Sequence, residues 1–352
     1  RYQKEIIEEV PEVDAVLGTT SYGDIVKALE EAVAGNHFEE FRDIDYLPDT
    51  GSKRVLTTGG HFGYLKIAEG CDKHCTYCII PKLRGKFRSV PMERLIAQAE
   101  DMAEQGVKEL ILVAQETTVY GKDLYGKKSL HILLKKLCEI RGIRWIRILY
   151  CYPEEIYDEL IETIRDEKKI CHYLDIPIQH ASDRILKRMG RRTSKQELID
   201  IVGKLRKEIP DMAITTDIIV GFPGETKEDV DETIDVIRRV KYDNAFTFIY
   251  SKRTGTPAAA MENQVPDADN KVRFDKLLAL VQSCAREQTA RYTGTVQEVL
   301  IEEVNDHKPG YVTGRMSNNL LVHFPGEASQ IGQYVNVSLD ECKGFYFMGT
   351  VV

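Results

Sequence analysis

The stretch YLKIAEGCDKHCTYC, residues 64–78, joins a short apolar segment to three closely spaced cysteines. The apolar segment has the length and composition of a buried strand. Cys71, Cys75 and Cys78 follow it in a C-x3-C-x2-C array, and the first of them lies three residues after the apolar core of the strand. Such an array arises by chance in roughly one chain of this size in a few hundred. We therefore expect the three thiols to bind something in the loop after the strand.

From residue 64 onward the sequence repeats one rhythm, in which an apolar strand leads through a polar turn into an amphipathic helix. Six such units with nearly continuous apolar strands predict a parallel sheet covered by helices, either an incomplete barrel or a doubly wound sheet. In both folds chemistry gathers at the carboxyl ends of the strands. The predicted strands begin at Tyr64, Glu109, Trp145, Tyr173, Ala213 and Ala245.

The two ends of the chain differ from this β-α part. Residues 1–45 predict a helix, a strand and a second helix, as in the tail of a separate α/β domain, and residues 46–62 predict a linker. Residues 261–285 predict a polar linker, 261–272, followed by a helix, and residues 286–352 alternate like a small antiparallel barrel. The β-α core is thus expected over residues 63–260.

Composition sets limits on the class of protein. The chain has 352 residues, 43% of them apolar, and a net charge of -8, which argues against a large nonspecific nucleic-acid surface. We find neither an apolar run of about 18 residues nor an apolar signal core, so we expect no membrane association. Because the sequence starts without Met, we expect it to begin inside a larger gene product. Eight cysteines without regular spacing favour a reducing cytoplasm.

Two metal groups suit the three cysteines. Zinc could use His74 as a fourth ligand, but His74 directly precedes Cys75, and adjacent residues rarely reach one tetrahedral ion. A [4Fe-4S] cluster suits three thiolates on a short loop, because each takes one iron. One iron then stays open and can be chelated by a small molecule. The remaining thiols are expected to be packed small hydrophobes: Cys138, Cys151, Cys171, Cys284 and Cys342.

These residues carry a family resemblance. The array C-x3-C-x-aromatic-C, followed by the segments YLDIPIQHASDRILKRMGRR and TTDIIVGFPGET, resembles the radical S-adenosylmethionine methylthiotransferases over nearly the whole chain. The resemblance implies a partial (β/α)6 barrel, and a closing TRAM barrel that contacts the macromolecular substrate. It also implies that the open iron binds the amino and carboxylate groups of S-adenosylmethionine.

The resemblance implies further cofactor-binding residues at the strand ends. Gln115 and Glu116 match a position that holds the amino group of the cofactor, and Arg191 matches a position that pairs with its carboxylate. Gln179 ends the fourth strand, where a buried structural amide is equally consistent. Tyr77 is expected to pack on the adenine, and its other interpretation is a core aromatic.

By the same resemblance, the segment GFPGET, residues 221–226, forms part of the cofactor cleft through Gly221 and Glu225. Its simpler interpretation is a Gly-Pro turn in which Thr226 caps the next helix. The basic run around Arg191 is otherwise a solvated face.

A radical explains why such a cofactor is needed. No accessible side-chain pKa makes an unactivated C–H carbon reactive, so acid-base chemistry cannot place a methylthio group there. In similar enzymes a second [4Fe-4S] cluster, held by three cysteines of an N-terminal domain, carries the sulfur. This sequence lacks those cysteines, so we expect that second cluster only in a full-length protein. We expect this chain to cleave S-adenosylmethionine, with an electron donor, but not to complete methylthiolation.

Two substrates compete. Up to about residue 210 the sequence resembles the branch that modifies an aspartate of a small-subunit ribosomal protein, and residues 211–352 resemble the branch that modifies an isopentenylated adenosine of tRNA. From Arg286 to the end there are five basic and eight acidic residues, a net charge of -3. An acidic barrel is a poor phosphate binder, which favours the ribosomal protein. A tRNA could still contact Arg84, Lys86 and Arg88.

A different class of function stays open at this point. The chain could be a zinc-stabilised RNA-binding module without catalysis, in which the small barrel is the reader. Brown, iron-containing protein would favour the enzyme, and colourless protein with one zinc would favour the module.

Overall fold

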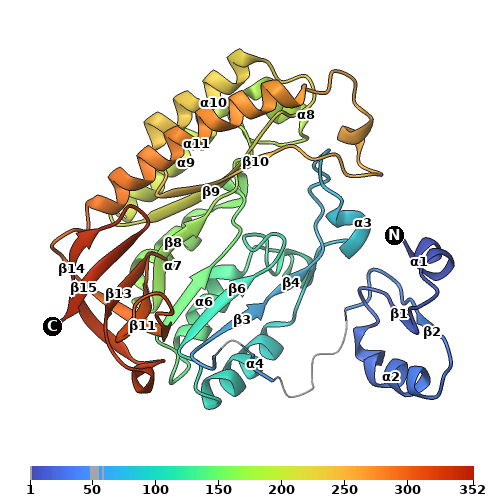
Figure 1. The fold of residues 1–352 in the computed structure, drawn as a ribbon, viewed down its shortest axis with the longest axis horizontal. Helices are drawn as coiled ribbons and strands as arrows, with labels where there is room; N and C mark the ends of the chain where they lie inside the picture. The colour runs from blue at the N-terminus through green and yellow to red at the C-terminus, as the bar shows by residue number, and fades with distance from the viewer. Residues whose placement is uncertain (1, 48–54, 58) are drawn as a thin grey trace.

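The computed structural model describes residues 2–47, 55–57 and 59–352, and its ribbon shows a curved central sheet with a helical outer layer, a small barrel at one end and a small unit at the N-terminus (Figure 1). The predicted linker 46–62 lies partly outside the described residues, because 48–54 and 58 are not among them. Within the described residues no helix is long and apolar enough to cross a membrane.

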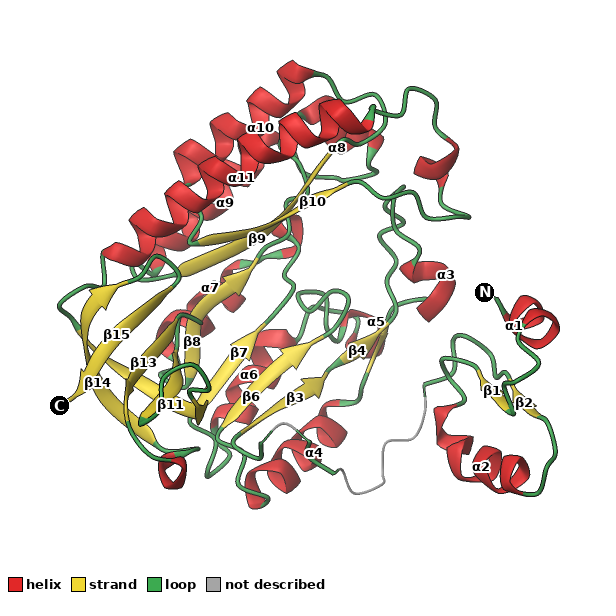
Figure 2. Ribbon diagram, viewed as in Figure 1, coloured by secondary structure: helices red, strands yellow, loops and turns green. Residues whose placement is uncertain are grey.

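The central sheet has six parallel strands in the order β10-β9-β8-β7-β6-β3. Each strand neighbours the next one along the chain, with no reversal of order. A doubly wound sheet needs such a reversal, so the incomplete barrel is the fold, as Figure 2 also shows. The strands are β3 (Phe62–Lys66), β6 (Glu109–Val113), β7 (Trp145–Ile148), β8 (Ile170–Asp175), β9 (Ala213–Val220) and β10 (Asn244–Ile249).

Alternation along the strands separates two faces of the sheet. Side chains such as Leu112, Ile146 and Ile218 pack with the helices in the main hydrophobic core. Their sequence neighbours, among them Arg147 and Asp217, face the inner side of the partial barrel. The covering helices are α4 (Met92–Glu104), α6 (Leu130–Cys138), α7 (Asp158–Asp166), α9 (Lys195–Glu208), α10 (Lys227–Val240) and α11 (Asp267–Ala290).

Helix α11 corrects one prediction. Residues 261–272 were expected to be a polar linker, but the helix begins at Asp267, inside that segment. Its first turn carries Asp267 and Asp269, and negative charge at a helix N-terminus is favourable. The buried side chain of Asn270 also anchors this turn against the core. Polarity here therefore marked the first turns of a helix.

The C-terminal residues form a closed five-stranded barrel in the order β11-β12-β13-β15-β14. The sequence predicted an antiparallel barrel, and four of the five pairs are antiparallel, but β13 and β15 pair in parallel. An odd number of strands cannot close a ring with antiparallel pairs alone, so one parallel pair is required. The strands are β11 (Val296–Val304), β12 (Tyr311–Met316), β13 (Leu321–Pro325), β14 (Tyr334–Cys342) and β15 (Tyr346–Val351).

This barrel packs against the amino ends of the central strands. Leu300 of β11 lies in one apolar cluster with Trp145, Tyr173 and Ala213 of the sheet. Arg147 of β7 donates from Nη1 to the carbonyl of Ser317 at 2.7 Å. The barrel thus closes the end of the sheet opposite to the cysteine loop.

The N-terminal unit contains α1 (Gln3–Glu9), β1 (Ala15–Leu17), α2 (Ile25–Val33) and β2 (Phe38–Glu40). The helix-strand-helix pattern was predicted, and the structure adds β2, which pairs in parallel with β1. The backbone N–H of Lys86 donates to Asp45 Oδ1 at 2.9 Å, so this unit contacts the segment after the cysteines.

Candidate functional site

The cysteine loop follows β3 and the short strand β4 (Ala68–Glu69), at the carboxyl end of the sheet. Gly70 has a φ of +81°, and a Cβ there would lie 2.0 Å from the carbonyl oxygen of Lys86. Only glycine therefore allows the chain to turn from the strand into the loop. Cys71 and Cys75 are buried and Cys78 is half-buried.

Two neighbouring segments hold the loop. Thr76 donates from its backbone N–H to Met189 and from its hydroxyl to Arg188, both at 2.9 Å. The carbonyl of Thr76 accepts the N–H of Ala258, also at 2.9 Å. The residue between Cys75 and Tyr77 is thus fixed from both sides.

The three thiols influence one another. Burial raises the pKa of Cys71 to about 11, and the charges of Cys75, Glu116 and Cys78 act in the same direction. Burial also raises the pKa of Cys78, while the N–H of Ile80 donates to its sulfur at 3.4 Å. Mutual repulsion of this kind is relieved when a cation binds the thiolates.

The positions of these side chains do not yet form a metal site. Over the described residues, no three Cys, His, Asp or Glu side chains stand together as metal ligands. The role of Cys71, Cys75 and Cys78 as ligands therefore stays a prediction. Cys75 and Cys78 do line a pocket of about 770 Å³, together with His74, Lys82 and Lys252.

Arg191 is the most informative side chain of the site. It is 7% exposed, and its Nη2 donates to the carbonyl of Pro177 at 2.7 Å. Its Nε and Nη1 are buried without a hydrogen-bond partner. The guanidinium stacks on Tyr152 at 4.3 Å from the ring centroid. A buried cation with two unused donors is costly unless an anion binds it.

Glu116 offers the complementary group. It is 1% exposed; its Oε1 accepts the N–H of Thr118 at 2.9 Å, whereas its Oε2 is buried without a partner. Burial raises the pKa of Glu116 to about 7, against the effects of Thr118 and the charge of Lys73. An ammonium group placed at Oε2 would favour the ionised carboxylate.

The carboxylate of Glu116 and the guanidinium of Arg191 thus both lie near the cysteine loop. The charge of Glu116 acts on the pKa of Cys71, and the charges of Cys75 and Arg191 act on the pKa of Tyr77. This pair of unsatisfied groups is complementary to the ammonium and carboxylate of an amino acid. The residues present therefore fit S-adenosylmethionine, whose methionine moiety carries both groups.

Tyr77, Gln115 and Gln179, which were also predicted to bind the cofactor, make contacts within the protein. Burial and the neighbouring Cys75 raise the pKa of Tyr77 well above its usual range, and Tyr77 packs beside the apolar cluster of Phe222 and Met189. Gln115 Oε1 accepts the N–H of Gly70 at 2.8 Å, so it supports the loop. Gln179 has a φ of +68° and joins its backbone to β9 through Asp217 and Ile219.

Glu225 is already engaged by the protein. Both carboxylate oxygens accept the N–H of Gly221 at 3.0 Å, and Arg273 and His180 occupy further positions around them. Thr226 caps α10, as the simpler interpretation of GFPGET expected. Contacts of Gly221 and Glu225 with a cofactor stay a prediction.

Several residues of the site were missed. Tyr150, with a φ of +61°, and Tyr152 lie two and four residues after the end of β7. Lys73 pairs with Glu155 at 2.5 Å. Burial and the nearby Asp175 raise the pKa of Asp217 on the inner face to about 7. Position after a strand, the signal that selected Gln115, would also have selected the two tyrosines.

Comparison with known proteins shows which families the chain resembles. The sequence pattern of the Radical SAM superfamily matches residues 65–237, and that of the TRAM domain matches residues 290–352. Ribosomal protein uS12 methylthiotransferase RimO of Lachnoclostridium phytofermentans is 52% identical over 359 residues, 99% of this chain and 81% of that protein. RimO of Clostridium perfringens strain ATCC 13124 is 43% identical over 358 residues, 100% of this chain and 80% of that protein.

A solved structure is also similar. Coproporphyrinogen III oxidase (HemN) from Escherichia coli, described as a radical SAM enzyme, aligns with a TM-score of 0.49 and 14% identity. The alignment covers 80% of this chain and 68% of that one.

Proposed function

The chain belongs to the RimO family of methylthiotransferases within the Radical SAM superfamily, and on this premise we propose that it inserts a methylthio group at the β-carbon of an aspartate of ribosomal protein uS12. The single observation that carries the proposal is the pair of unsatisfied buried groups, Arg191 and Glu116, beside the three cysteines. An enzyme of this superfamily has a [4Fe-4S] cluster and S-adenosylmethionine at one site, and the pair supports that arrangement.

The residues of the chain have separate tasks in this proposal. Cys71, Cys75 and Cys78 would hold a [4Fe-4S] cluster through three of its irons, so that the fourth iron would lack a protein ligand. Arg191 binds the carboxylate of S-adenosylmethionine, and Glu116 binds its ammonium. When bound, the cofactors supply a carbon radical that removes a hydrogen atom from the target C–H. Tyr77 and Tyr152 line the site and exclude water from it.

The sulfur comes from elsewhere in the proposal. The five other cysteines lie apart in the chain, and three of them, Cys151, Cys171 and Cys284, are buried. By resemblance, an N-terminal domain would hold a second [4Fe-4S] cluster that would supply the sulfur. An external electron donor would reduce the first cluster.

Charge supports a ribosomal protein as the substrate. The C-terminal barrel is acidic, with a net charge of -3 from Arg286 to the end. Of the three basic residues considered for tRNA, Arg84 lies 3.6 Å from Glu69, and Arg88 lies 3.3 Å from Asp45. These ion pairs reduce the positive charge that a phosphate would meet.

Two experiments test the proposal. Protein purified without oxygen should contain about four irons per chain, little zinc, and should release 5'-deoxyadenosine when reduced with S-adenosylmethionine. Cys75→Ala should abolish this release, whereas Cys342→Ala, a matched change in the C-terminal barrel, should not. Colourless protein with one zinc would contradict the enzymatic proposal.

The substrate is tested with the chain joined to an N-terminal methylthiotransferase domain. Offered uS12 and tRNA together, it should produce modified aspartate in uS12. Modified adenosine without modified aspartate would overturn the choice of substrate and leave the radical chemistry intact.

A further inference from the structure

The turn after β9 is built around one buried carboxylate. Glu225 is 5% exposed, and both of its oxygens accept the N–H of Gly221. His180 Nδ1 accepts the N–H of Ser182 at 3.0 Å, so the neutral ring carries its proton on Nε2. Nε2 then donates to Glu225 Oε2 at 3.2 Å. The Glu225 carboxylate therefore connects two residues of the turn, Gly221 and Glu225, and connects the turn to His180 in the segment after β8.

A cation from α11 completes this arrangement. Arg273 Nη1 donates to Glu225 Oε1 at 2.8 Å and to the backbone carbonyl of Glu225 at 3.0 Å. One guanidinium thus holds both the side chain and the main chain of the same residue. Removing either partner of such a pair is costly, because the other charge is then left buried and unpaired.

A second residue of α11 shapes the same turn. Gly221 has a φ of +77°, and a Cβ on it would lie 2.0 Å from Asn270 Oδ1. Asn270 is buried, and its Nδ2 donates to the carbonyl of Val265 at 3.2 Å. The first turns of α11 therefore lie directly against the turn after β9.

The turn is connected to the cysteine loop. Arg188 Nε donates to the carbonyl of Pro223 at 3.2 Å, and the guanidinium of Arg188 lies within 3.1 Å of the position of a Cβ on Gly224. The carbonyl of Arg188 accepts the hydroxyl of Thr76, which stands between Cys75 and Tyr77. A continuous set of contacts leads from Arg273 through Glu225 and Arg188 to the loop.

From these contacts we propose that Arg273 is a positioning residue for S-adenosylmethionine, acting through Glu225 on the turn 221–226 and on the cysteine loop. The inference rests on the proposed function and deepens it, since it names a residue on α11, outside the central sheet, that sets cofactor affinity. Arg273 does not itself touch the cofactor. Its removal leaves a buried carboxylate without its cation, and the turn then changes its shape to solvate that charge.

The test compares two cations of the same helix. Arg273→Met removes the buried contact, and Lys276→Met removes an exposed pair with Asp231, at 2.6 Å, in which both side chains are about half exposed. Kd for S-adenosylmethionine is measured by equilibrium binding to cluster-loaded protein, and Tm is measured on the same samples. We expect Arg273→Met to raise Kd about tenfold and Lys276→Met to raise it less than about twofold.

A conservative variant separates positioning from folding. Arg273→Lys keeps the charge but cannot donate two hydrogen bonds in the same geometry, so we expect a Kd about threefold above wild type. If Arg273→Met does not fold, the Kd of Arg273→Lys against Lys276→Met decides. A lower Tm with an unchanged Kd in the arginine variants would overturn the proposal.

The failures are distinguishable. Wild-type protein that neither binds nor cleaves S-adenosylmethionine would overturn the proposed function, and the present inference with it. Wild-type protein that binds and cleaves the cofactor, beside an Arg273 variant with unchanged Kd, would overturn the role of Arg273 alone.

Discussion

Two buried arginines at opposite ends of the central sheet have different surroundings. Arg147, on β7 near the C-terminal barrel, donates to Glu109 at 2.7 Å and to the carbonyls of Ser317 and Met316. Arg191, near the cysteine loop, donates to one carbonyl and leaves two nitrogens unused. Both side chains are almost inaccessible to water.

Two glutamates next to β6 repeat this difference. Glu109 begins the strand and pairs with Arg147 and, at 3.5 Å, with Arg315. Glu116 lies three residues after the strand and leaves Oε2 unpaired. Buried charge is costly unless it is paired. The paired end of the sheet, with Arg147 and Glu109, therefore has a structural role and connects the central sheet to the C-terminal barrel. The unpaired end is expected to be completed by a ligand.

The largest predicted effect is at the paired end. Arg147→Met leaves Glu109 buried without its closest cation, and we expect the free energy of unfolding to fall by about 3–5 kcal/mol. Denaturant unfolding measures this loss. The folded fraction should keep its affinity for S-adenosylmethionine, and a large loss of affinity there would remove the distinction between the two ends.

At the unpaired end, near Arg191, we expect a large effect on cofactor affinity and a small effect on the free energy of unfolding. Arg191→Met removes the cation proposed to bind the cofactor carboxylate, and we expect affinity for S-adenosylmethionine to fall about 100-fold. Calorimetric titration measures it. The free energy of unfolding should change by less than about 1 kcal/mol, because the relief of a buried charge offsets the loss of the contact with Tyr152. Severe destabilisation would show that Arg191 is structural.

Glu116 predicts a pH dependence with a defined sign. Its pKa of about 7 means that the carboxylate is mostly protonated at pH 6 and mostly ionised at pH 7.5. If the ionised form binds the ammonium, affinity for S-adenosylmethionine should rise about fivefold across that interval. The gain in ionised carboxylate is partly offset, because an α-ammonium with a pKa of ~7.7–8.0 begins to lose its proton by about pH 7.5. Glu116→Gln should abolish the slope. The same slope in that variant would assign it to another group.

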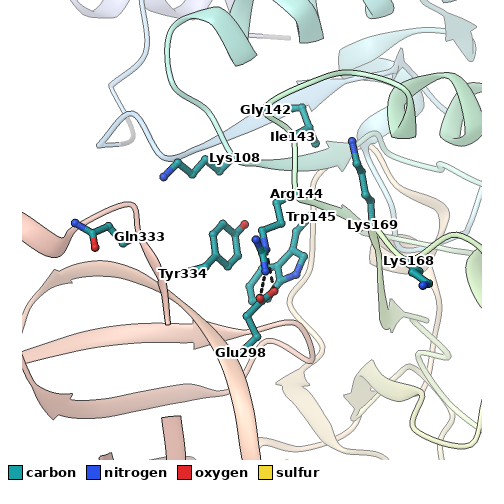
Figure 3. A pocket seen from close by; sticks show the side chains of 10 residues that line it. All are labelled: Lys108, Gly142, Ile143, Arg144, Trp145, Lys168, Lys169, Glu298, Gln333 and Tyr334. Carbon is teal, nitrogen blue, oxygen red and sulfur yellow. Dashed lines mark hydrogen bonds and ion pairs between the residues drawn. The ribbon is translucent and has the colours of Figure 1, made fainter. Parts of the chain in front are cut away.

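The smallest effect belongs to an exposed ion pair near the paired end. Arg144 donates from Nε to Glu298 at 3.1 Å, stacks on Tyr334 and lines a pocket of about 660 Å³ between core and barrel (Figure 3). Its side chain is 55% exposed, so solvent screens the pair. Arg144→Ala together with Glu298→Ala should cost less than about 1 kcal/mol of unfolding free energy. A loss as large as that of Arg147→Met would mean that burial does not decide the outcome.

Much of the fold followed from sequence pattern. Apolar runs such as ELILV located the strands, because both their faces are covered or closely packed. The parallel pair β13–β15 was not predictable from alternation, which is the same for parallel and antiparallel neighbours in so short a strand. The early start of α11 was missed because polar residues that contact a distant turn look like a linker in the sequence.

The site was predicted in part. Spacing selected the three cysteines, and resemblance selected Glu116 and Arg191. Their roles as ligands stay predictions. The sequence could not show that Glu225 is already saturated while Glu116 is not, because hydrogen-bond satisfaction depends on segments far apart in the chain. Arg273, 48 residues after Glu225, has no local signal at all.

The most direct test of the central claim is Mössbauer spectroscopy of the wild-type protein loaded with ⁵⁷Fe, recorded with and without S-adenosylmethionine. If three thiolates leave one iron open beside Arg191 and Glu116, the cofactor should change the signal of about one iron in four and leave the others unchanged. Four equivalent irons that do not respond to S-adenosylmethionine would contradict the account.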